Sequence, residues 1–313
     1  MKLVSRPRTN QYKMDVTRFH IEPTNICTLK CSGCARTRFI EQWPQHWKNQ
    51  SLDVDFLLDF LDVDLTDKKI VLCGNYGDPI YHPDFINFVK KLKSQGVILS
   101  INTNGSYKNQ EWWRELVDNL DSNDLITFSV DGTPENFTQY RINADWESIK
   151  VGMDVVADSK CGSSWKYIPF AFNQFDIDQV KQLSQDIGIK QFYVEFSDRF
   201  DEKTKELMPD MSLIGSRYSA QTEWKSNSSE SKVNPKCNSG REHFITAEGH
   251  YSPCCYLADH RFYYKTLFGK NKKQYDIRNH TLTEILQQPQ TIDFYQTLDQ
   301  QSGCQYNCPK TVG

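Results

Sequence analysis

Three cysteines lie close together near the start of the chain, Cys27, Cys31 and Cys34, with the spacing C-x3-C-x2-C. Thiolates bind soft metals, and iron–sulfur clusters are held by cysteine sulfurs. A [4Fe–4S] cluster has four irons, so three cysteines on one loop leave one iron open to a small molecule. The same spacing also suits part of a zinc site, with His20 or His46 as the fourth ligand.

A second group of cysteines lies near the other end of the chain: Cys237, Cys254, Cys255, Cys304 and Cys308. The segment HFITAEGHYSPC alternates around Glu248-Gly249, a two-residue turn signal, so it predicts a hairpin. Four thiolates hold either one iron–sulfur cluster or a structural zinc ion. With ten cysteines in a chain expected to be cytosolic, metal binding explains them better than disulfides do.

The elements that must position these cysteines alternate between strands and helices. We expect strands over Thr17–Glu22, Lys69–Leu72, Val97–Ile101, Leu125–Val130, Tyr167–Phe172 and Gln191–Phe196. We expect helices over Leu52–Leu61, Pro83–Leu92, Trp112–Leu120, Trp146–Ala157 and Ile177–Ile187. This alternation predicts an α/β fold with parallel strands, whose active site lies at the carboxyl ends of the strands.

The composition of the chain indicates its domain organisation and excludes some classes of partner. Residues 201–236 are polar and serine-rich, which predicts a bridging segment between a domain over residues 1–200 and a cysteine-bearing module over residues 237–313. The formal net charge of −3 gives no field that would attract nucleic acid or an anionic membrane. The start of the chain lacks a secretory h-region, and no apolar run reaches the roughly 18 residues that span a bilayer. We therefore expect a soluble, cytoplasmic protein.

The three-cysteine loop after the first strand resembles the radical S-adenosylmethionine (SAM) superfamily, and three more strand-end motifs match in order. Gly74, Asn75, Tyr76, Gly77 and Asp78 stand where the family has its GGEP-type loop, with Asp78 in place of Glu. The later matches are NTNG, with Asn102 and Asn104; SVDG, with Ser129 and Asp131; and the downstream Arg141.

The resemblance implies a partial (β/α)6 TIM-like barrel in which these loops contact SAM and Arg141 pairs with its carboxylate. One departure concerns the residue before the third cysteine, which in the family is usually aromatic and lies against adenine. Here that residue is Gly33, so this position lacks the family's aromatic contact to adenine, while the cluster ligands are unaffected.

The C-terminal cysteines resemble the auxiliary-cluster modules known as SPASM and its shorter form, twitch. The tail has five cysteines, fewer than the full form needs for two clusters, so the resemblance implies one auxiliary [4Fe–4S] cluster. Its ligands would be Cys237, Cys254, Cys304 and Cys308, with Cys255 as the alternative to Cys254 and zinc as the alternative metal.

The implied chemistry is reductive cleavage of SAM to a 5′-deoxyadenosyl radical, which removes a hydrogen atom from a substrate. A flavodoxin- or ferredoxin-type protein would donate the electron. We expect oxidative modification of a peptide or protein. The alternatives are dehydrogenation of a sugar- or cyclitol-type molecule and a non-catalytic metal-binding module.

Four residues outside these motifs also bear on the chemistry. Cys255 could return a hydrogen atom to a substrate radical, and Glu195 on the sixth strand could either face SAM or substrate or be a surface carboxylate. We expect Cys73 to be a small core residue and Cys161 to be exposed and inert.

Overall fold

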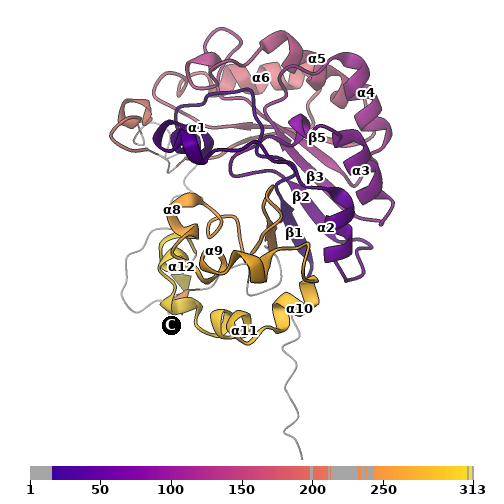
Figure 1. The fold of residues 1–313 in the computed structure, drawn as a ribbon. Coiled ribbons are helices and arrows are strands. Elements are labelled where there is room, and N and C mark those ends of the chain that lie inside the picture. The colour runs from indigo at the N-terminus through magenta and orange to yellow at the C-terminus, as the bar shows by residue number, and fades with distance from the viewer. Residues whose placement is uncertain are drawn as a thin grey trace, which may run out of the picture.

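The computed structural model describes residues 16–197, 200–210, 212, 232–233, 237, 243–308 and 310–311. Its centre is an eight-stranded sheet with the order β6-β5-β4-β3-β2-β1-β8-β9 (Figure 1). The strands are β1 (Arg18–Ile21), β2 (Lys69–Leu72), β3 (Ile98–Thr103), β4 (Leu125–Ser129), β5 (Gly162–Tyr167), β6 (Gln191–Val194), β8 (His243–Ile245) and β9 (Tyr251–Ser252). A separate pair joins β7 (Lys232–Val233) to β10 (Lys310–Thr311).

The first six strands run parallel in sequence order, which confirms the expected α/β fold. Adjacent strands pair in register, with Ile21 beside Leu72, and Leu72 beside Ile101. The carboxyl ends of these strands therefore meet along one edge of the sheet, and the loops that follow them lie together.

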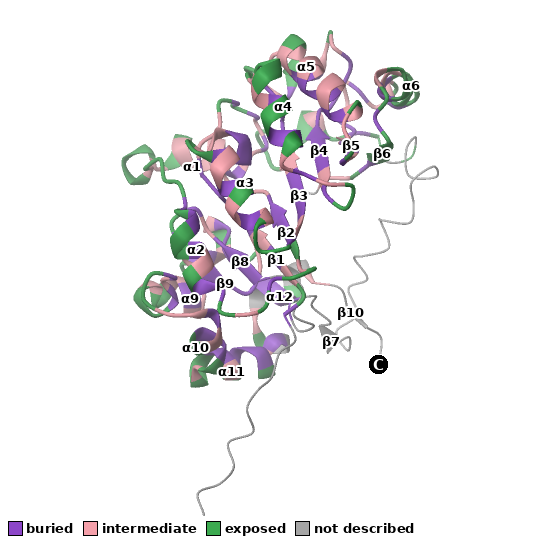
Figure 2. Cartoon of the chain, turned by 90° about the vertical axis from the view of Figure 1, so that its right-hand side faces the viewer, coloured by how far each residue is buried: buried purple, intermediate pink, exposed green. Residues whose placement is uncertain are grey.

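Helices cover the outer face of this sheet (Figures 1 and 2). They are α2 (Val54–Phe60), α3 (Phe85–Lys93), α4 (Gln110–Asp118), α5 (Trp146–Ala157) and α6 (Ile177–Ile187), whereas α1 (Ala35–Gln42) follows the cysteine loop and lies apart from them (Figure 1). Side-chain caps begin three of them: Asp53 accepts from the first turn of α2, Asn109 from that of α4 and Asp145 from that of α5. The α6 helix ends at Gly188, whose φ of 91° suits glycine.

The two faces of the sheet differ in polarity. Every second strand residue, such as Ile70, Leu99, Ile126 and Trp165, is fully buried against the helices. The opposite, inner face carries polar side chains, including the row Ser129, Lys166 and Tyr193 across β4, β5 and β6. The inner face is thus available for polar ligands and the outer face forms the core.

Two expectations about this region are wrong. The fifth strand is Gly162–Tyr167, not Tyr167–Phe172, because the serines of GSSWKY bond to neighbouring strands; Ser164 Oγ lies 2.8 Å from Thr127 Oγ1. Cys161 is fully buried instead of exposed, with its sulfur 3.1 Å from Ser159 Oγ. The α1 helix after the cysteine loop was not expected from the sequence.

The C-terminal module continues the barrel sheet. Strand β8 pairs parallel with β1 and antiparallel with β9, and Gly249 at a φ of 80° makes the turn between β8 and β9, so the expected hairpin is present. Helices α8 (His260–Tyr263), α9 (Leu267–Lys270), α10 (Leu282–Gln287), α11 (Pro289–Gln296) and α12 (Ser302–Asn307) follow. Most of the expected bridging segment lies outside the described residues. None of the helices in the described ranges is long and apolar enough to cross a membrane.

Candidate functional site

The three-cysteine loop connects β1 to α1. Cys34 directly precedes α1, and its backbone N–H donates to the carbonyl of Cys31 at 3.0 Å, which closes a tight turn. The thiol of Cys27 is within electrostatic range of Cys31 and Cys34. Burial is the main cause that raises the pKa of Cys27, and it raises that of Cys31 to about 12. Burial therefore disfavours the free thiolate at Cys27 and Cys31, and a bound metal centre would supply the positive charge that stabilises it.

Two side chains from other loops approach these sulfurs. Asn104 Nδ2 lies 3.6 Å from Cys27 Sγ, and the guanidinium of Arg141 donates a hydrogen bond to Cys31. Donors of this kind stabilise thiolate ligands and set the properties of a cluster. The number and softness of the thiols and the presence of these donors fit a cluster that is coordinated by three cysteines.

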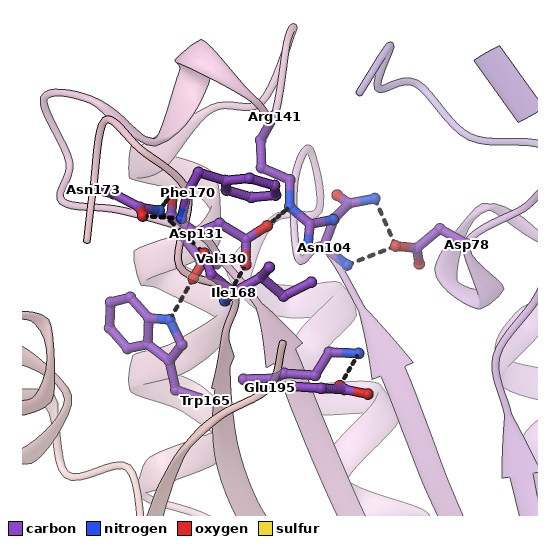
Figure 3. Close-up of polar contacts among 11 residues, drawn as sticks. Asp78, Asn104, Val130, Asp131, Arg141, Trp165, Ile168, Phe170, Asn173 and Glu195 are labelled. Carbon is purple, nitrogen blue, oxygen red and sulfur yellow. Dashed lines mark hydrogen bonds and ion pairs between the residues drawn. The ribbon is translucent and has the colours of Figure 1, made fainter. Parts of the chain in front are cut away.

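Asp78 orders the loop after β3 (Figure 3). Its carboxylate accepts from the backbone N–H of Asn104 and from Asn104 Nδ2, each at 2.6 Å, and from Thr103 Oγ1 at 2.8 Å and Ile80 N at 3.3 Å. Burial raises the pKa of Asp78 to about 6, although these hydrogen bonds oppose the shift. Asp78 therefore fixes the orientation of Asn104 toward Cys27.

Arg141 is held by Asp131 in the same way (Figure 3). Arg141 Nε donates to Asp131 Oδ2 at 2.7 Å, and Asp131 Oδ1 accepts from the backbone of Ile168 at 2.9 Å. The Asp131 side chain is fully buried and that of Arg141 is 15% exposed. Because Nε is used by Asp131, the terminal nitrogens of Arg141 remain for Cys31 and for an anionic ligand.

Glu22, at the end of β1, is a site residue that the sequence analysis missed. Its Oε1 accepts from the backbone N–H groups of Tyr76 at 2.7 Å and Gly77 at 3.2 Å, and Ala247 of the module also donates to it. Burial raises the pKa of Glu22 to about 7. The signal available in the sequence was its position, an acidic residue directly after the strand that leads into the cysteine loop.

The 74–79 loop packs too closely on its neighbours for larger residues. A Cβ atom at Gly77 would lie 1.8 Å from the carbonyl oxygen of Thr24, and one at Gly74 would lie 2.3 Å from Glu22 Oε1. The side chains of the two residues between these glycines reach the module. Asn75 Nδ2 donates to the carbonyl of Cys255 at 2.8 Å, and the Tyr76 hydroxyl accepts from the backbone of His260 at 2.8 Å.

The structure brings the second group of cysteines together from three separate segments. The thiol of Cys254 interacts with Cys237 and Cys308, and Cys304 interacts with all three of the others. Cys237 and Cys304 are buried, and Cys254 and Cys308 are half-buried. Within the described ranges, no three His, Cys, Asp or Glu side chains form a ready-made site for a single metal ion. The fit to a cluster rests on the four thiols that meet here.

The remaining candidates lie on the inner face of the sheet. Glu195 is half-exposed, and its Oε2 lies 3.4 Å from Lys166 Nζ (Figure 3). Asn102 bonds to the thiol of Cys73, which is half-buried on this face instead of being a core residue.

The fold and site together define an iron–sulfur protein with two thiol groups, one at the carboxyl ends of a parallel sheet and one in an attached module. The sequence model of the Radical SAM superfamily matches residues 21–187, and that of the SPASM iron–sulfur cluster-binding domain matches residues 237–309. The chain belongs to the radical SAM superfamily. Its cofactors are a SAM-binding [4Fe–4S] cluster, an auxiliary iron–sulfur cluster and SAM itself.

Two curated relatives share sequence with this chain. The tungsten-containing aldehyde ferredoxin oxidoreductase cofactor-modifying protein of Pyrococcus furiosus is 32% identical over 119 residues, which are 37% of this chain and 31% of the relative. The cysteine-type anaerobic sulfatase-maturating enzyme of Clostridium novyi is 39% identical over 67 residues, 21% of this chain and 17% of the relative. The matches thus span about a third or less of the curated relatives' length.

Solved structures share the fold over most of the chain. The structure of anSMEcpe with bound AdoMet and the Cp18Cys peptide has a TM-score of 0.60 and 14% identity, and covers 90% of this chain and 82% of its own. Streptococcus suis SuiB bound to its precursor peptide SuiA has a TM-score of 0.60 and 12% identity, with 90% and 67% covered. At these identities the likeness shows the fold alone.

Proposed function

We propose that this protein uses SAM radical chemistry to oxidise a peptide or protein substrate. The proposal is supported by the pairing of a radical SAM domain with a SPASM-type module. It is also supported by relatives of the same architecture, since the solved neighbours carry bound peptides and the Clostridium novyi relative is described as sulfatase-maturating.

The observation that carries the proposal is a single loop that lies between the two cysteine groups. The 74–79 loop of the SAM site donates from Asn75 to the carbonyl of Cys255, which is adjacent to Cys254 of the second group. The same loop reaches the first group, because the backbone N–H of Asp78 donates to the carbonyl of Ile26, next to Cys27, at 3.0 Å. A substrate held near this loop could lose a hydrogen atom on one side and an electron on the other.

In this proposal Cys27, Cys31 and Cys34 hold the SAM-binding cluster, and Cys237, Cys254, Cys304 and Cys308 hold the auxiliary cluster. When bound, the reduced cluster and SAM supply a 5′-deoxyadenosyl radical that removes a hydrogen atom from the substrate. The protein's own residues bind and orient. The terminal nitrogens of Arg141 pair with the SAM carboxylate, and the backbone of the glycine loop from Gly74 to Asp78 receives the SAM amino group.

Other polar residues at the strand ends complete the proposed SAM site. Asn102, Asn104, Ser129 and Asp131 line the carboxyl ends of β3 and β4, and Asp131 acts by holding Arg141. Burial by the loops around them excludes water, which protects a reactive intermediate.

Two residues are proposed to act on the substrate. Glu195 is half-exposed on the inner face and paired with Lys166, so it can accept the proton that leaves an oxidised substrate. The carbonyl of Cys255 meets the 74–79 loop, and a hydrogen atom donated by its thiol to the substrate radical would give a redox-neutral product in place of the oxidised one. The electron that starts each turnover would come from a flavodoxin- or ferredoxin-type donor.

The test is anaerobic turnover of the reconstituted full-length chain with SAM and dithionite, together with short peptides encoded beside its gene. We expect 5′-deoxyadenosine and a peptide that has lost two hydrogen atoms, both detected by mass spectrometry. Release of 5′-deoxyadenosine with every such peptide unchanged would contradict the peptide assignment.

A small-molecule substrate is the second candidate, because the Pyrococcus furiosus relative is described as a cofactor-modifying protein. The same assay separates the two candidates. A sugar-, cyclitol- or cofactor-like molecule that raises 5′-deoxyadenosine release and is itself dehydrogenated would favour this second function.

A further inference from the structure

The cysteine loop leaves a space at Gly33 that a side chain from another loop occupies. A Cβ atom at Gly33 would lie 2.9 Å from Tyr140 Oη and 3.3 Å from Tyr140 Cε2. The tip of the Tyr140 ring thus rests directly on the backbone between Cys31 and Cys34. A large side chain at position 33 and the tyrosine at position 140 cannot both fit in their present places.

The Tyr140 ring is fixed by the loops that follow β4 and β5. Its centroid lies 4.2 Å from that of Phe170, with an angle of 30° between the rings. The backbone N–H of Phe170 donates to Asn173 Oδ1 at 2.6 Å, and Asn173 Nδ2 donates to the carbonyl of Asp131 at 3.0 Å (Figure 3). The ring is therefore preorganised by a network that also holds Arg141, the next residue.

Tyr140 lies against the cysteines that bind the cluster. It shares a small apolar group with Leu29, Cys31 and Phe170, and Tyr140 itself is 7% exposed. Its hydroxyl lies against the backbone of Gly33, between Cys31 and Cys34.

We propose that Tyr140 contacts the adenine base of SAM and supplies the aromatic ring that Gly33 cannot provide. SAM has a single aromatic part, and its amino-carboxylate end is charged and suits Arg141, which follows Tyr140 in the chain. Phe170 covers one face of the ring and the guanidinium carbon of Arg141 lies 5.7 Å from its centroid, so adenine would meet the edge of the ring, where the phenol hydroxyl can donate to a ring nitrogen. Gly33 is the residue that allows this arrangement, because any side chain there would displace the tyrosine.

The experiment compares SAM with methionine, which has the same amino-carboxylate end but no adenosyl group. Equilibrium dialysis of labelled SAM and labelled methionine against the reconstituted, unreduced full-length protein gives both dissociation constants without turnover. We expect Tyr140→Leu to weaken SAM roughly 5- to 100-fold, the order of loss found when an aromatic contact to a nucleobase is removed. Methionine should keep its affinity within about twofold.

Further variants guard against a folding defect. Tyr140→Phe keeps the ring and removes only the hydroxyl, so it should weaken SAM less than Tyr140→Leu does. Gly33→Ala adds a methyl group beside Tyr140 Oη and should also weaken SAM selectively. Phe175→Leu, at a side chain that is 75% exposed, is the matched control and should change neither affinity.

The outcomes distinguish this inference from the assignment of SAM as cofactor. Equal losses for SAM and methionine in Tyr140→Leu, or no loss for either, would overturn the role of Tyr140. Wild-type protein that binds neither ligand would instead contradict the SAM site as a whole.

Discussion

Substitution of Asp78 by Asn tests whether this carboxylate organises the SAM site. Asp78 accepts four hydrogen bonds, two on each oxygen. The amide oxygen of Asn can keep the two bonds from Asn104, so the new NH2 group faces the donors of Thr103 and Ile80. Each buried donor that loses a charged acceptor costs about 1 to 3 kcal/mol. Two such donors cost about 2 to 6 kcal/mol, and the burial penalty that raises the pKa of Asp78 offsets part of this cost, so we expect a net loss of about 3 kcal/mol in the free energy of unfolding.

For a chain of this length, that loss corresponds to a fall in Tm of about 5 °C. The assay is thermal and urea unfolding at about pH 8, where Asp78, with a pKa of about 6, is ionised. Asp84→Asn removes an exposed carboxylate from the same loop and should change stability by less than about 0.5 kcal/mol. If Asp78→Asn and Asp84→Asn unfold alike, Asp78 does not carry the network, and the argument that it orients Asn104 fails.

Three further changes probe neighbouring parts of the site. Burial raises the pKa of Glu22 from 4.5 to about 7, so the free energy of unfolding of the wild type should fall by roughly 2 kcal/mol between about pH 5.5 and pH 8. Glu22→Gln should not show this fall. Urea unfolding that gives the same pH dependence for both proteins would count against this prediction. Gly77→Ala places a methyl group on the Thr24 carbonyl and should abolish SAM binding in dialysis, whereas unchanged binding would show that the loop can move. Cys304→Ala should lower bound iron by about four per chain and keep SAM binding; loss of SAM binding would mean that the two groups are not separate sites.

Much of the barrel follows from sequence because its signals are local. The buried strand KIVL and the helix over Ile177–Ile187 have the bounds that their apolar patterns predict. The strand GSSWKY was misplaced because its serines look like a loop until their partners on β4 are known. Cys161 was expected at the surface for the same reason, since its burial depends on elements that pack over the start of that strand.

The candidate site likewise has a part that local sequence signals predict and a part that they do not. The order of strand-end motifs indicated the SAM loops, because parallel strands place successive loops together. What the sequence could not show are contacts between distant segments, such as Glu22 with the 74–79 loop, Asn75 with Cys255, and Tyr140 over Gly33. These contacts depend on how β8 pairs with β1 and on which side chain occupies the space beside Gly33. Neither feature produces a periodic pattern in the sequence.

The central claim is that one iron of the cluster at Cys27, Cys31 and Cys34 is open and takes SAM. Electron paramagnetic resonance of the anaerobically reconstituted and reduced full-length chain tests it most directly. The account predicts about eight irons per chain. It also predicts that one component of the paramagnetic resonance signal changes when SAM is added. A signal that SAM leaves unaltered, in protein that carries both clusters, would contradict it.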